Sequence, residues 1–311
     1  MTATLAHRTQ YLALRGVLRG LGAMNWERAG ALGARLGAMG YKPLGIRRHV
    51  VERQIAAAFP GLSREALSHL ARASYEHLGR VTVESALMSR LAKDDVLRLF
   101  ERTENWSLLE RSLAAGRGMI IVGGHLGNWE LAGAYFAARG LPLDVVVRRM
   151  SNPLFDAYIN RTRLRLGMKV VYDSEAVRHI TRAIPGGRAI GLMADQGVLN
   201  LASTYVPFFG RPAKTPRGPA VFALRWNVPM IFFACIRQQN GRYHLALEEI
   251  PVHDTGDRES DVNTVVAAFT GALERWVRRV PEQYFWQHRR WKWQEPGTPA
   301  ELGDPSADGH G

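Results

Sequence analysis

Cysteine is almost missing from this chain of 311 residues, which contains only Cys235. A disulfide within the chain is therefore impossible, and this is compatible with a reducing compartment. Cys235 lies in the apolar run 229–236, so we expect it to be a core residue. No cluster of Cys and His has the spacing of a zinc site, and we predict no metal and no cofactor.

Long apolar runs are missing as well. No stretch reaches the roughly 18 uncharged apolar residues that a membrane-spanning helix requires. The N-terminal segment also lacks the apolar core and the small-residue cleavage site of a signal peptide. It is interrupted by Arg15, Arg19, Arg28 and Arg35. A phosphate loop of the Walker or dinucleotide type is absent too, because Gly123-Gly124 alone is too weak a signal.

Negative charge is scarce relative to positive charge. The chain has 41 Lys and Arg against 28 Asp and Glu, a formal net charge of +13. This balance indicates an anionic partner such as a membrane surface, nucleic acid or a phosphorylated substrate, unless it is only a solvated basic surface. Residues 1–60 hold nine Lys or Arg and two Glu, a net of +7. We interpret residues 1–45 as a basic amphipathic segment on an anionic membrane; packing of its apolar face on the core is an alternative that can hold at the same time.

Apolar patterning divides the chain into a helical first third and an alternating remainder. In the first third we expect helices at 7–40, 46–59, 63–90, 93–102 and 105–115. Strands are then expected at 119–122, 144–148, 169–172 and 189–194, with helices between them at 127–139, 152–166 and 174–184. This alternation predicts an α/β fold, with a mostly parallel central sheet flanked by helices and an N-terminal helical region.

The rest of the chain continues this mixture. We expect strands at 205–209, 229–237 and 242–249, and helices at 216–226 and 261–280. The last two strands are predicted to form a hairpin through Gln239-Asn240-Gly241. Residues 46–295 would then be one main domain. Residues 296–311 carry Pro, Gly and Asp with little apolar content, and we predict a disordered tail there.

An imidazole stands at the end of the first expected strand, in Gly-Gly-His-Leu-Gly-Asn-Trp-Glu, residues 123–130. His125 is followed five residues later by Glu130, in the first turn of the next helix. A carboxylate on one imidazole nitrogen fixes the tautomer, so the other nitrogen can take a proton from an alcohol. We predict that Glu130 orients His125 in this way. Asp195 also follows a strand, and ligands of such sheets bind beyond the C-terminal strand ends, so it is expected to face the same crevice.

Arginines gather after the second of these strands. Arg148 and Arg149 leave the strand, Asn152-Pro153 opens a helix, and that helix carries arginines at 161, 163 and 165. Guanidinium groups near a strand end can clamp phosphate or carboxylate. The alternative is a solvated helix face, since positions 161 and 165 share a face that 163 does not.

Three further motifs follow. Ala194-Asp195-Gln196 ends a buried strand with two polar side chains at the expected ligand edge. Val-Pro-Phe-Phe-Gly, residues 206–210, suits the lining of a lipid groove, or else core and turn. Residues 281–292, Pro-Glu-Gln-Tyr-Phe-Trp-Gln-His-Arg-Arg-Trp-Lys, interleave aromatic and basic side chains. Such interleaving is typical of stacking on nucleic-acid bases and of interfacial aromatic belts.

Taken in order, these motifs resemble those of the bacterial lipid A biosynthesis acyltransferases. They are Gly-His-x4-Glu, Arg-Arg-x2-Asn-Pro-Leu, Ala-Asp-Gln, Val-Pro-Phe-Phe-Gly and Pro-Glu-Gln-Tyr-x-Trp-x-His-Arg-Arg, within residues 10–295. These lauroyl and myristoyl transferases belong to the lysophospholipid acyltransferase superfamily. The resemblance implies a glycerolipid acyltransferase-like domain at 46–295. It also implies a peripheral or N-terminally anchored place on the cytoplasmic face of the inner membrane.

The resemblance further implies the substrates and the site. A fatty acyl group would pass from acyl carrier protein or coenzyme A, as co-substrate, to a hydroxyl of a glycolipid, such as a lipid A precursor in lipopolysaccharide biosynthesis. His125 and Glu130 become the catalytic pair, with phosphate contacts expected from Arg148, Arg149 and Arg163. Asp195 and Gln196 become further site residues. The remaining expected substrate-binding residues are Asn128, Asn152, Phe208 and Phe209.

Two departures from the family pattern are visible. Members often have a continuous hydrophobic anchor where this chain has arginines, and many carry another polar residue where this chain has Gly197. A mycobacterial branch with similar motifs acylates phosphatidylinositol mannosides. Another glycolipid of that kind, or a lysophospholipid, is therefore an alternative acceptor.

The mechanism we expect is direct transfer. His125 would be the general base on the acceptor hydroxyl, and no Ser or Cys has the context of a nucleophile that forms an acyl-enzyme. Donors to the oxyanion are expected from the backbone amides of Gly124 to Asn128, or from an arginine. Two alternatives stand beside this reading. One is a basic nucleic-acid-binding protein, which leaves His125 and Glu130 unexplained, so we predict no nucleic-acid partner; the other is a hydrolase that uses the same two side chains.

Overall fold

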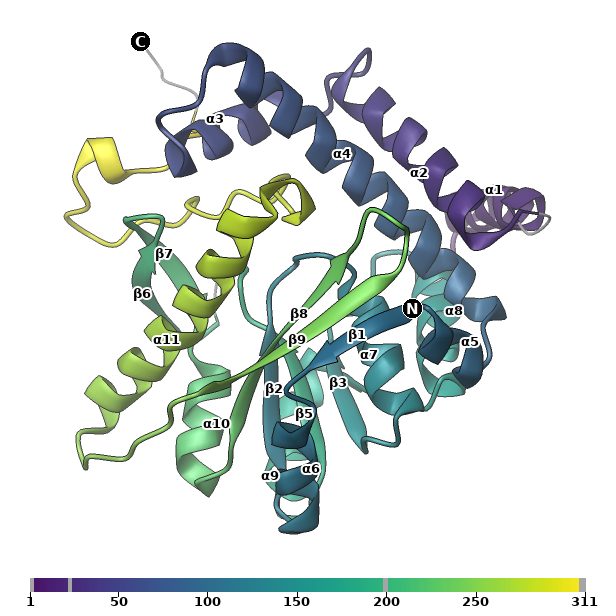
Figure 1. Ribbon diagram of the computed structural model, residues 1–311. Coiled ribbons are helices and arrows are strands. Elements are labelled where there is room, and N and C mark those ends of the chain that lie inside the picture. Colours follow the sequence, from purple (N-terminus) through teal and green to yellow (C-terminus); the bar gives the residue numbers. More distant parts are fainter. Residues whose placement is uncertain (1–2, 22–23, 198–200, 308–311) are drawn as a thin grey trace.

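A seven-stranded sheet forms the centre of the computed structural model (Figure 1). The structure describes the chain except for residues 1–2, 22–23, 198–200 and 308–311. The strand order is β1-β9-β8-β2-β5-β3-β4, and every neighbouring pair is parallel except β8 and β9. These strands are β1 (Phe100–Glu104), β2 (Met119–Gly123), β3 (Leu143–Val147), β4 (Lys169–Tyr172), β5 (Ala189–Met193), β8 (Met230–Arg237) and β9 (Tyr243–Ile250). The predicted mostly parallel sheet is confirmed.

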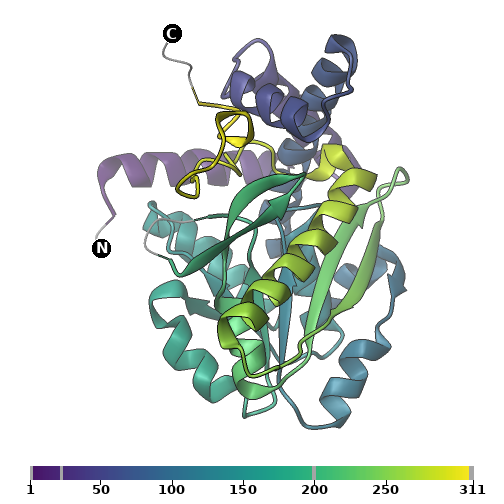
Figure 2. The ribbon, with the colours of Figure 1, turned by 90° about the vertical axis from the view of Figure 1, so that its left-hand side faces the viewer.

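Helices cover both faces of this sheet. Side chains alternate along β2, so Ile120 and Val122 enter one hydrophobic cluster while Met119 and Ile121 enter the other. The first cluster is closed by α9 (Ala176–Ala183), α10 (Gly218–Trp226) and α11 (Arg258–Arg279). The second is closed by α5 (Lys93–Arg98), α6 (Ser107–Ala114) and α7 (Trp129–Ala138). Figure 2 shows α11 crossing its face obliquely.

The N-terminal helices lie beyond the ends of the strands rather than on a face. They are α1 (Leu5–Leu21), α2 (Trp26–Tyr41), α3 (Arg48–Ala58) and α4 (Arg64–Leu87). In Figure 1, α4 passes above the sheet and α2 runs along α4. Glycines permit this close helix packing, because a Cβ on Gly37 would lie 2.0 Å from the carbonyl oxygen of Tyr75. Among the residues that the structure describes, none of the helices could cross a bilayer by its length and apolar character.

A small hairpin, the helix that follows β3 and short 3-10 turns complete the fold. β6 (Ser203–Phe208) pairs in antiparallel fashion with β7 (Arg211–Pro216), outside the main sheet. α8 (Pro153–Arg165) follows β3 and contacts α1, where Tyr11 lies against Phe155 with 6.3 Å between ring centroids. The short 3-10 turns are η1 (Met88–Arg90), η2 (Asp173–Glu175), η3 (Pro281–Gln283) and η4 (Ala300–Leu302).

The structure differs from the sequence-based expectations about the fold in three places. The single helix expected at 93–102 is divided into α5 and the edge strand β1, which pairs in parallel with β9. β7 was not expected at all. Within the tail expected to be disordered, residues 296–307 are held to the domain, because Arg289 binds Asp304 and Arg53 donates to the carbonyl of Ala307 at 3.0 Å. The rest of that tail, residues 308–311, lies outside the described residues. The partner of β1 is distant in sequence, so local patterning carried no sign of it, whereas β7 pairs with β6 directly before it.

Candidate active site

Two strand ends meet at the centre of the sheet, where β2 and β5 are parallel neighbours. Gly123 pairs with Met193, and the amide of Ala194 donates to the carbonyl of Gly123 at 2.9 Å. Both chains then leave the sheet at its C-terminal edge, the edge at which ligands of parallel sheets bind. His125 and Asp195 follow within two residues, so this register brings them together.

Asp195 holds His125 by two contacts. Its Oδ1 lies 2.7 Å from the ring Nδ1 of His125, and its Oδ2 accepts the backbone amide of the same residue at 2.9 Å. The carboxylate is buried, whereas the His125 side chain keeps 21% of its area exposed. Nδ1 is therefore the protonated nitrogen and donates to Asp195, which leaves Nε2 as the nitrogen that can accept a proton.

The electrostatics of this pair favour its charged form. Burial alone would lower the pKa of His125, but the Asp195 carboxylate outweighs it, so the pKa lies above its ordinary value. Burial likewise opposes ionisation of Asp195, yet the imidazole charge and the two hydrogen bonds lower the pKa of this carboxyl to about 2. Asp195 is thus ionised over the whole neutral range and stabilises an imidazolium at His125.

Glu130 does not orient the ring, and the prediction that it does was wrong. Glu130 lies in the first turn of α7 and forms a two-point ion pair with Arg163 on α8, including an Arg163 Nε to Oε2 contact of 3.0 Å. Its charge still acts on His125, since it helps to raise the pKa of the ring. The helix turn directs Glu130 toward α8, whereas Asp195 reaches the ring directly from the neighbouring strand.

The predicted arginine cluster is spread along a chain of contacts. Arg163 donates to Asn160 Oδ1 at 2.8 Å, and Asn160 Nδ2 donates to the Tyr172 hydroxyl at 3.2 Å. The guanidinium of Arg149 lies 3.8 Å from the centroid of the Tyr172 ring. Arg148 is exposed and contacts Asp173 at 3.3 Å. Arg148 and Arg149 therefore lie at the open end of this chain, and Arg163 at its buried end.

The two asparagines of the predicted site are helix caps. Asn128 accepts the amide of Leu131 at 3.0 Å and begins α7, while Asn152 accepts the amide of Leu154 at 3.0 Å and begins α8. Both are buried. The amide group of Asn152 also contacts α1, at the carbonyl of His7 and the side chain of Gln10. Both side chains are thus held by partners within the protein, which gives no support to the substrate contacts that we expected.

Phe208 and Phe209 are core residues rather than the lining of a groove. Both are buried, and their rings pack on each other and on Trp286, Trp291 and Tyr284. The alternative reading of their motif as core and turn is therefore the correct one. Burial of Trp286 and Trp291 also removes two of the aromatic rings that stacking on nucleic-acid bases would require. Gln196 is half-buried beside Asp195.

Four of the five backbone amides expected to bind an oxyanion are occupied. Besides His125, the amide of Leu126 donates to the carbonyl of Gly124, that of Gly127 to Gln283, and that of Asn128 to Cys235, at 2.7, 2.9 and 2.9 Å. The four amides of residues 125–128 thus have partners within the protein. Donation to the oxyanion from the amide of Gly124 or from an arginine stays a prediction.

The segment after η3 contributes residues that the sequence-based site did not include. The amide of Phe285 donates to the carbonyl of His125 at 3.0 Å, so this segment lies along the His125 loop. Arg290 is buried, binds the carbonyl of Lys214 and the hydroxyl of Thr215, and helps to lower the pKa of Asp195. Burial lowers the pKa of His288 to about 4, so it is neutral. The aromatic–basic motif was the signal that could have identified them.

The fold and this geometry define an α/β protein in which a buried carboxylate holds a partly exposed histidine at the C-terminal edge of a mostly parallel sheet. Comparison with known proteins gives the family. Residues 3–293 match the family described as bacterial lipid A biosynthesis acyltransferase, and the chain belongs to that family. It is therefore an acyltransferase, and the family resemblance read from its motifs is confirmed.

Individual relatives agree with this assignment. The chain is 28% identical over 266 residues to the lipid A biosynthesis palmitoleoyltransferase of Escherichia coli (strain K12), with 84% of each chain covered. It is 24% identical over 272 residues to the lipid A biosynthesis lauroyltransferase of the same strain, covering 87% of each. It is also 23% identical over 263 residues to a phosphatidylinositol mannoside acyltransferase of Mycolicibacterium smegmatis (strain ATCC 700084 / mc(2)155), covering 83% of each.

Proposed function

We propose that this acyltransferase moves a fatty acyl chain from an acyl thioester to a hydroxyl of a lipid A precursor, with His125 as general base. The observation that carries the chemistry is the two-point contact between His125 and Asp195. The choice of acceptor is supported by the two Escherichia coli relatives, whose names are those of lipid A acyltransferases. The donor is acyl carrier protein or coenzyme A.

The proposed step begins at Nε2 of His125, which takes the proton of the acceptor hydroxyl as its oxygen attacks the thioester carbonyl carbon. An ester C–O bond forms and the C–S bond breaks. The imidazolium then returns the proton to the departing thiolate, so the enzyme ends in its starting state. Asp195 stabilises the imidazolium between these events, which is the part of the barrier that a buried carboxylate lowers.

The side chains around the ring suggest how the substrates lie. Trp129 and Phe285 flank His125, with ring centroids 4.9 and 6.0 Å away. Both also line a narrow crevice between α4 and η3, together with Leu78 and Val81. We propose that the acyl chain lies along this apolar side. Arg148 and Arg149, on the exposed side, would bind phosphate of the acceptor or donor, and Arg163 would act by holding Glu130.

Purified protein tests this function directly. The assay combines a lauroyl thioester of acyl carrier protein, or lauroyl-CoA, with a lipid A precursor, and follows acylated product by mass spectrometry. Transfer with release of free thiol supports the proposal. Free fatty acid formed without acceptor would instead show a hydrolase. Parallel reactions with a phosphatidylinositol mannoside and a lysophospholipid decide the acceptor, and preference for either would replace lipid A.

Membrane binding at the cytoplasmic face of the inner membrane forms the second part of the proposal. α1 projects from the body of the protein in Figure 2, with Leu5 and Leu12 strongly exposed. The connection from α2 to α3 adds Leu44 and Ile46, which are 63% and 56% exposed. Lys42, Arg47 and Arg48 adjoin these two apolar side chains. Apolar side chains beside cations are suited to the interface of an anionic bilayer.

Liposome flotation measures this binding. We expect the protein to float with vesicles that contain phosphatidylglycerol and to remain behind with neutral vesicles or at high salt. Replacement of both Leu44 and Ile46 by Glu should reduce flotation while secondary structure is retained. Equal flotation of this variant would leave α1 as the membrane contact, and failure of the unaltered protein to float would reject membrane binding.

A further inference from the structure

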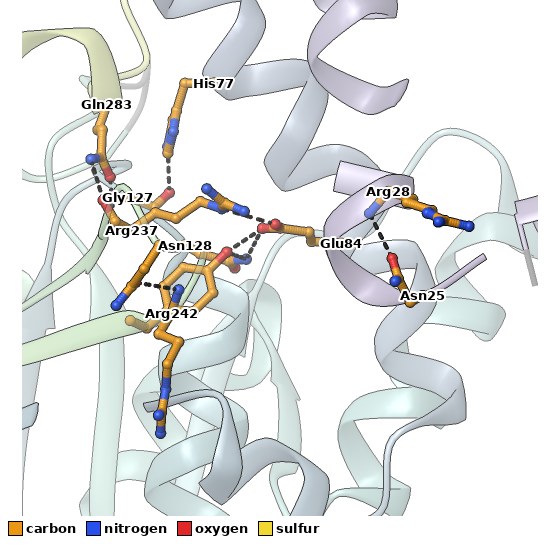
Figure 3. A network of polar contacts seen from close by, with 11 residues as sticks. Asn25, Arg28, His77, Glu84, Gly127, Asn128, Arg237, Arg242 and Gln283 are labelled. Carbon is orange, nitrogen blue, oxygen red and sulfur yellow. Dashed lines mark hydrogen bonds and ion pairs between the residues drawn. The ribbon is translucent and has the colours of Figure 1, made fainter. Parts of the chain in front are cut away.

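Glu84, on α4, is a fully buried carboxylate outside the His125–Asp195 pair. It accepts hydrogen bonds from Asn128 Nδ2 at 3.2 Å, from Arg237 Nε at 3.2 Å and from the Tyr243 hydroxyl (Figure 3). Burial raises the pKa of Glu84, while the Tyr243 and Arg237 donors oppose that rise. Three donors on two oxygens call for an acceptor-only group, which a carboxylate is and an amide is not.

Asn128 links Glu84 to the loop that carries His125. Its Oδ1 caps α7 through the amide of Leu131, while its Nδ2 is held by Glu84 and, at 3.3 Å, by the Tyr243 hydroxyl. One side chain thereby connects α4, the start of α7 and β9. Since Asn128 is three residues from His125, its position limits how far the loop can shift.

A second path runs from α4 to the same loop. His77 Nε2 lies 3.3 Å from the carbonyl oxygen of Gly127. Burial lowers the pKa of His77 to about 4, so the ring is neutral, and Nε2 must carry the hydrogen to donate to this carbonyl. On the other side of Gly127, its amide donates to the carbonyl of Gln283, whose side chain exchanges two hydrogen bonds with the backbone of Arg237 at 3.0 and 2.9 Å.

These contacts close a ring through Glu84, Arg237, Gln283, Gly127 and Asn128. From this ring we propose that Glu84 is a positioning residue, which fixes the loop His125–Asn128 so that both the amide and Nδ1 of His125 reach Asp195. The inference rests on the proposed role of His125. It assigns to α4, a helix of the N-terminal layer, a direct part in holding the general base.

The loop has little room to adapt if this support is removed. Gly127 has φ +63°, and a Cβ there would lie 1.8 Å from the carbonyl oxygen of Cys235, so the loop already touches β8. Any shift must therefore be away from the sheet, which lengthens both contacts between His125 and Asp195. A misplacement of about 1 Å at a reacting group can lower a rate by about 100-fold.

The test is Glu84→Gln, which keeps the shape but replaces one acceptor oxygen by a donor. We expect kcat to fall about 10- to 100-fold with KM changed less than about threefold, because substrate contacts are untouched. A second readout is the pKa of the His125 ring, measured by NMR. It should fall, because Asp195 and Glu130 are the carboxylates that raise it and the Asp195 contact is weakened.

A matched control and a rescue separate positioning from simple destabilisation. Asp144 is an equally buried carboxylate, paired with His179 and Arg188 near the other edge of the sheet, so Asp144→Asn should lower Tm and leave kcat and the His125 pKa unchanged. The double variant Glu84→Gln with Asn128→Asp exchanges donor and acceptor and keeps the cap on α7. It should recover most of the lost kcat.

Wild-type kcat and His125 pKa in a folded Glu84→Gln variant would overturn the inference. If that variant does not fold, the same two measurements on Tyr243→Phe decide the question by the same criteria, because this change removes only one hydroxyl, which donates to Glu84 and accepts from Asn128. Failure of the proposed function is distinguishable, because His125→Ala would then retain activity. An active His125→Ala rejects the general base, whereas an inactive His125→Ala with unaffected Glu84 and Tyr243 variants rejects only the positioning.

Discussion

Of the three histidine–carboxylate pairs among the described residues, two have a buried carboxylate, and these two lie near opposite edges of the same sheet. His125 and Asp195 are 2.7 Å apart, and His179 Nε2 and Asp144 Oδ2 are 2.5 Å apart. The histidine side chains are 21% and 22% exposed, and both carboxylates are buried. Spacing and burial therefore do not tell the pairs apart.

The surroundings of the two carboxylates distinguish the pairs. Asp144 is also bound by the guanidinium of Arg188, which neutralises its charge by a direct ion pair. Among the described residues, no Lys or Arg forms an ion pair with Asp195, and its second oxygen accepts the backbone amide of His125 instead. Asp144 lies near the start of β3, whereas Asp195 follows the end of β5, at the edge where ligands of parallel sheets bind. A charged acceptor at the ligand edge can support a base, while a neutralised one at the opposite edge joins elements of the fold.

Removal of each imidazole should give the sharpest contrast. We expect His125→Ala to lower the rate of acyl transfer by about 100- to 10,000-fold, because no other side chain would take the hydroxyl proton. His179→Ala should leave the rate within about twofold and lower Tm, since only a structural pair is lost. Steady-state kinetics and thermal melts of both variants check this. Equal effects of the two substitutions would contradict the comparison.

Asp195→Asn tests the charge beneath the ring and should cost about 100-fold or more in kcat, because the tautomer and the imidazolium lose their support. A base must be unprotonated, so the raised pKa of His125 places the acidic limb of the kcat/KM profile above pH 6.5 in the unaltered enzyme. In Asp195→Asn this limb should move to lower pH. A profile that does not move would show that another group titrates.

The same carboxyl makes a prediction about acid stability. The pKa of Asp195 is lowered from 3.8 to about 2 in the folded state. Its contribution to the free energy of unfolding is therefore complete above the unfolded value and is lost as pH falls from about 4 to about 2. Denaturant melts across this window should show a smaller loss of stability for Asp195→Asn than for the unaltered protein.

Substitution of Glu130 should lower kcat less than substitution of Asp195. Glu130 is paired with Arg163 and acts on the His125 ring only by its charge, without a direct contact. We expect Glu130→Ala to lower kcat about 10-fold, with Glu130→Asp retaining part of the activity. Arg163→Ala should be similar, and the double variant should not exceed either single one, because the two residues act as a unit. Additive losses would indicate that Arg163 has its own contact with substrate.

The smallest effects are expected at Arg148 and Arg149, the two exposed arginines that follow β3. Arg148→Ala and Arg149→Ala should each raise KM for one substrate by about 5- to 20-fold with little change in kcat, and Arg→Lys should rescue only partly, since lysine lacks the bidentate geometry. Arg161→Ala, an exposed arginine on α8, is the control and should change neither constant. Measurement of KM for donor and acceptor separately shows which substrate each arginine binds. Unchanged constants in all three variants would favour a solvated face.

Local patterning in the sequence determined most of the elements. The hairpin through Asn240-Gly241, the strand Lys169–Tyr172 and the cap at Ser63 were all predicted correctly, because periodicity and turn chemistry act over a few residues. The motif around His125 likewise identified the ligand edge. Edge strand β1 was missed because its partner β9 is distant in sequence, whereas β7 was missed although its partner β6 lies directly before it.

The partners of the site were decided by tertiary structure alone. The sequence placed Glu130 near His125 by spacing, but the register of β2 with β5 brings Asp195 to the ring, and the packing of α7 on α8 turns Glu130 toward Arg163. Glu84 is 41 residues before His125 and carries no motif of its own, so only the folded α4 shows its contact with the loop. Chain spacing fixes which residues can be near a strand end, whereas sheet register and helix packing fix which side chains touch.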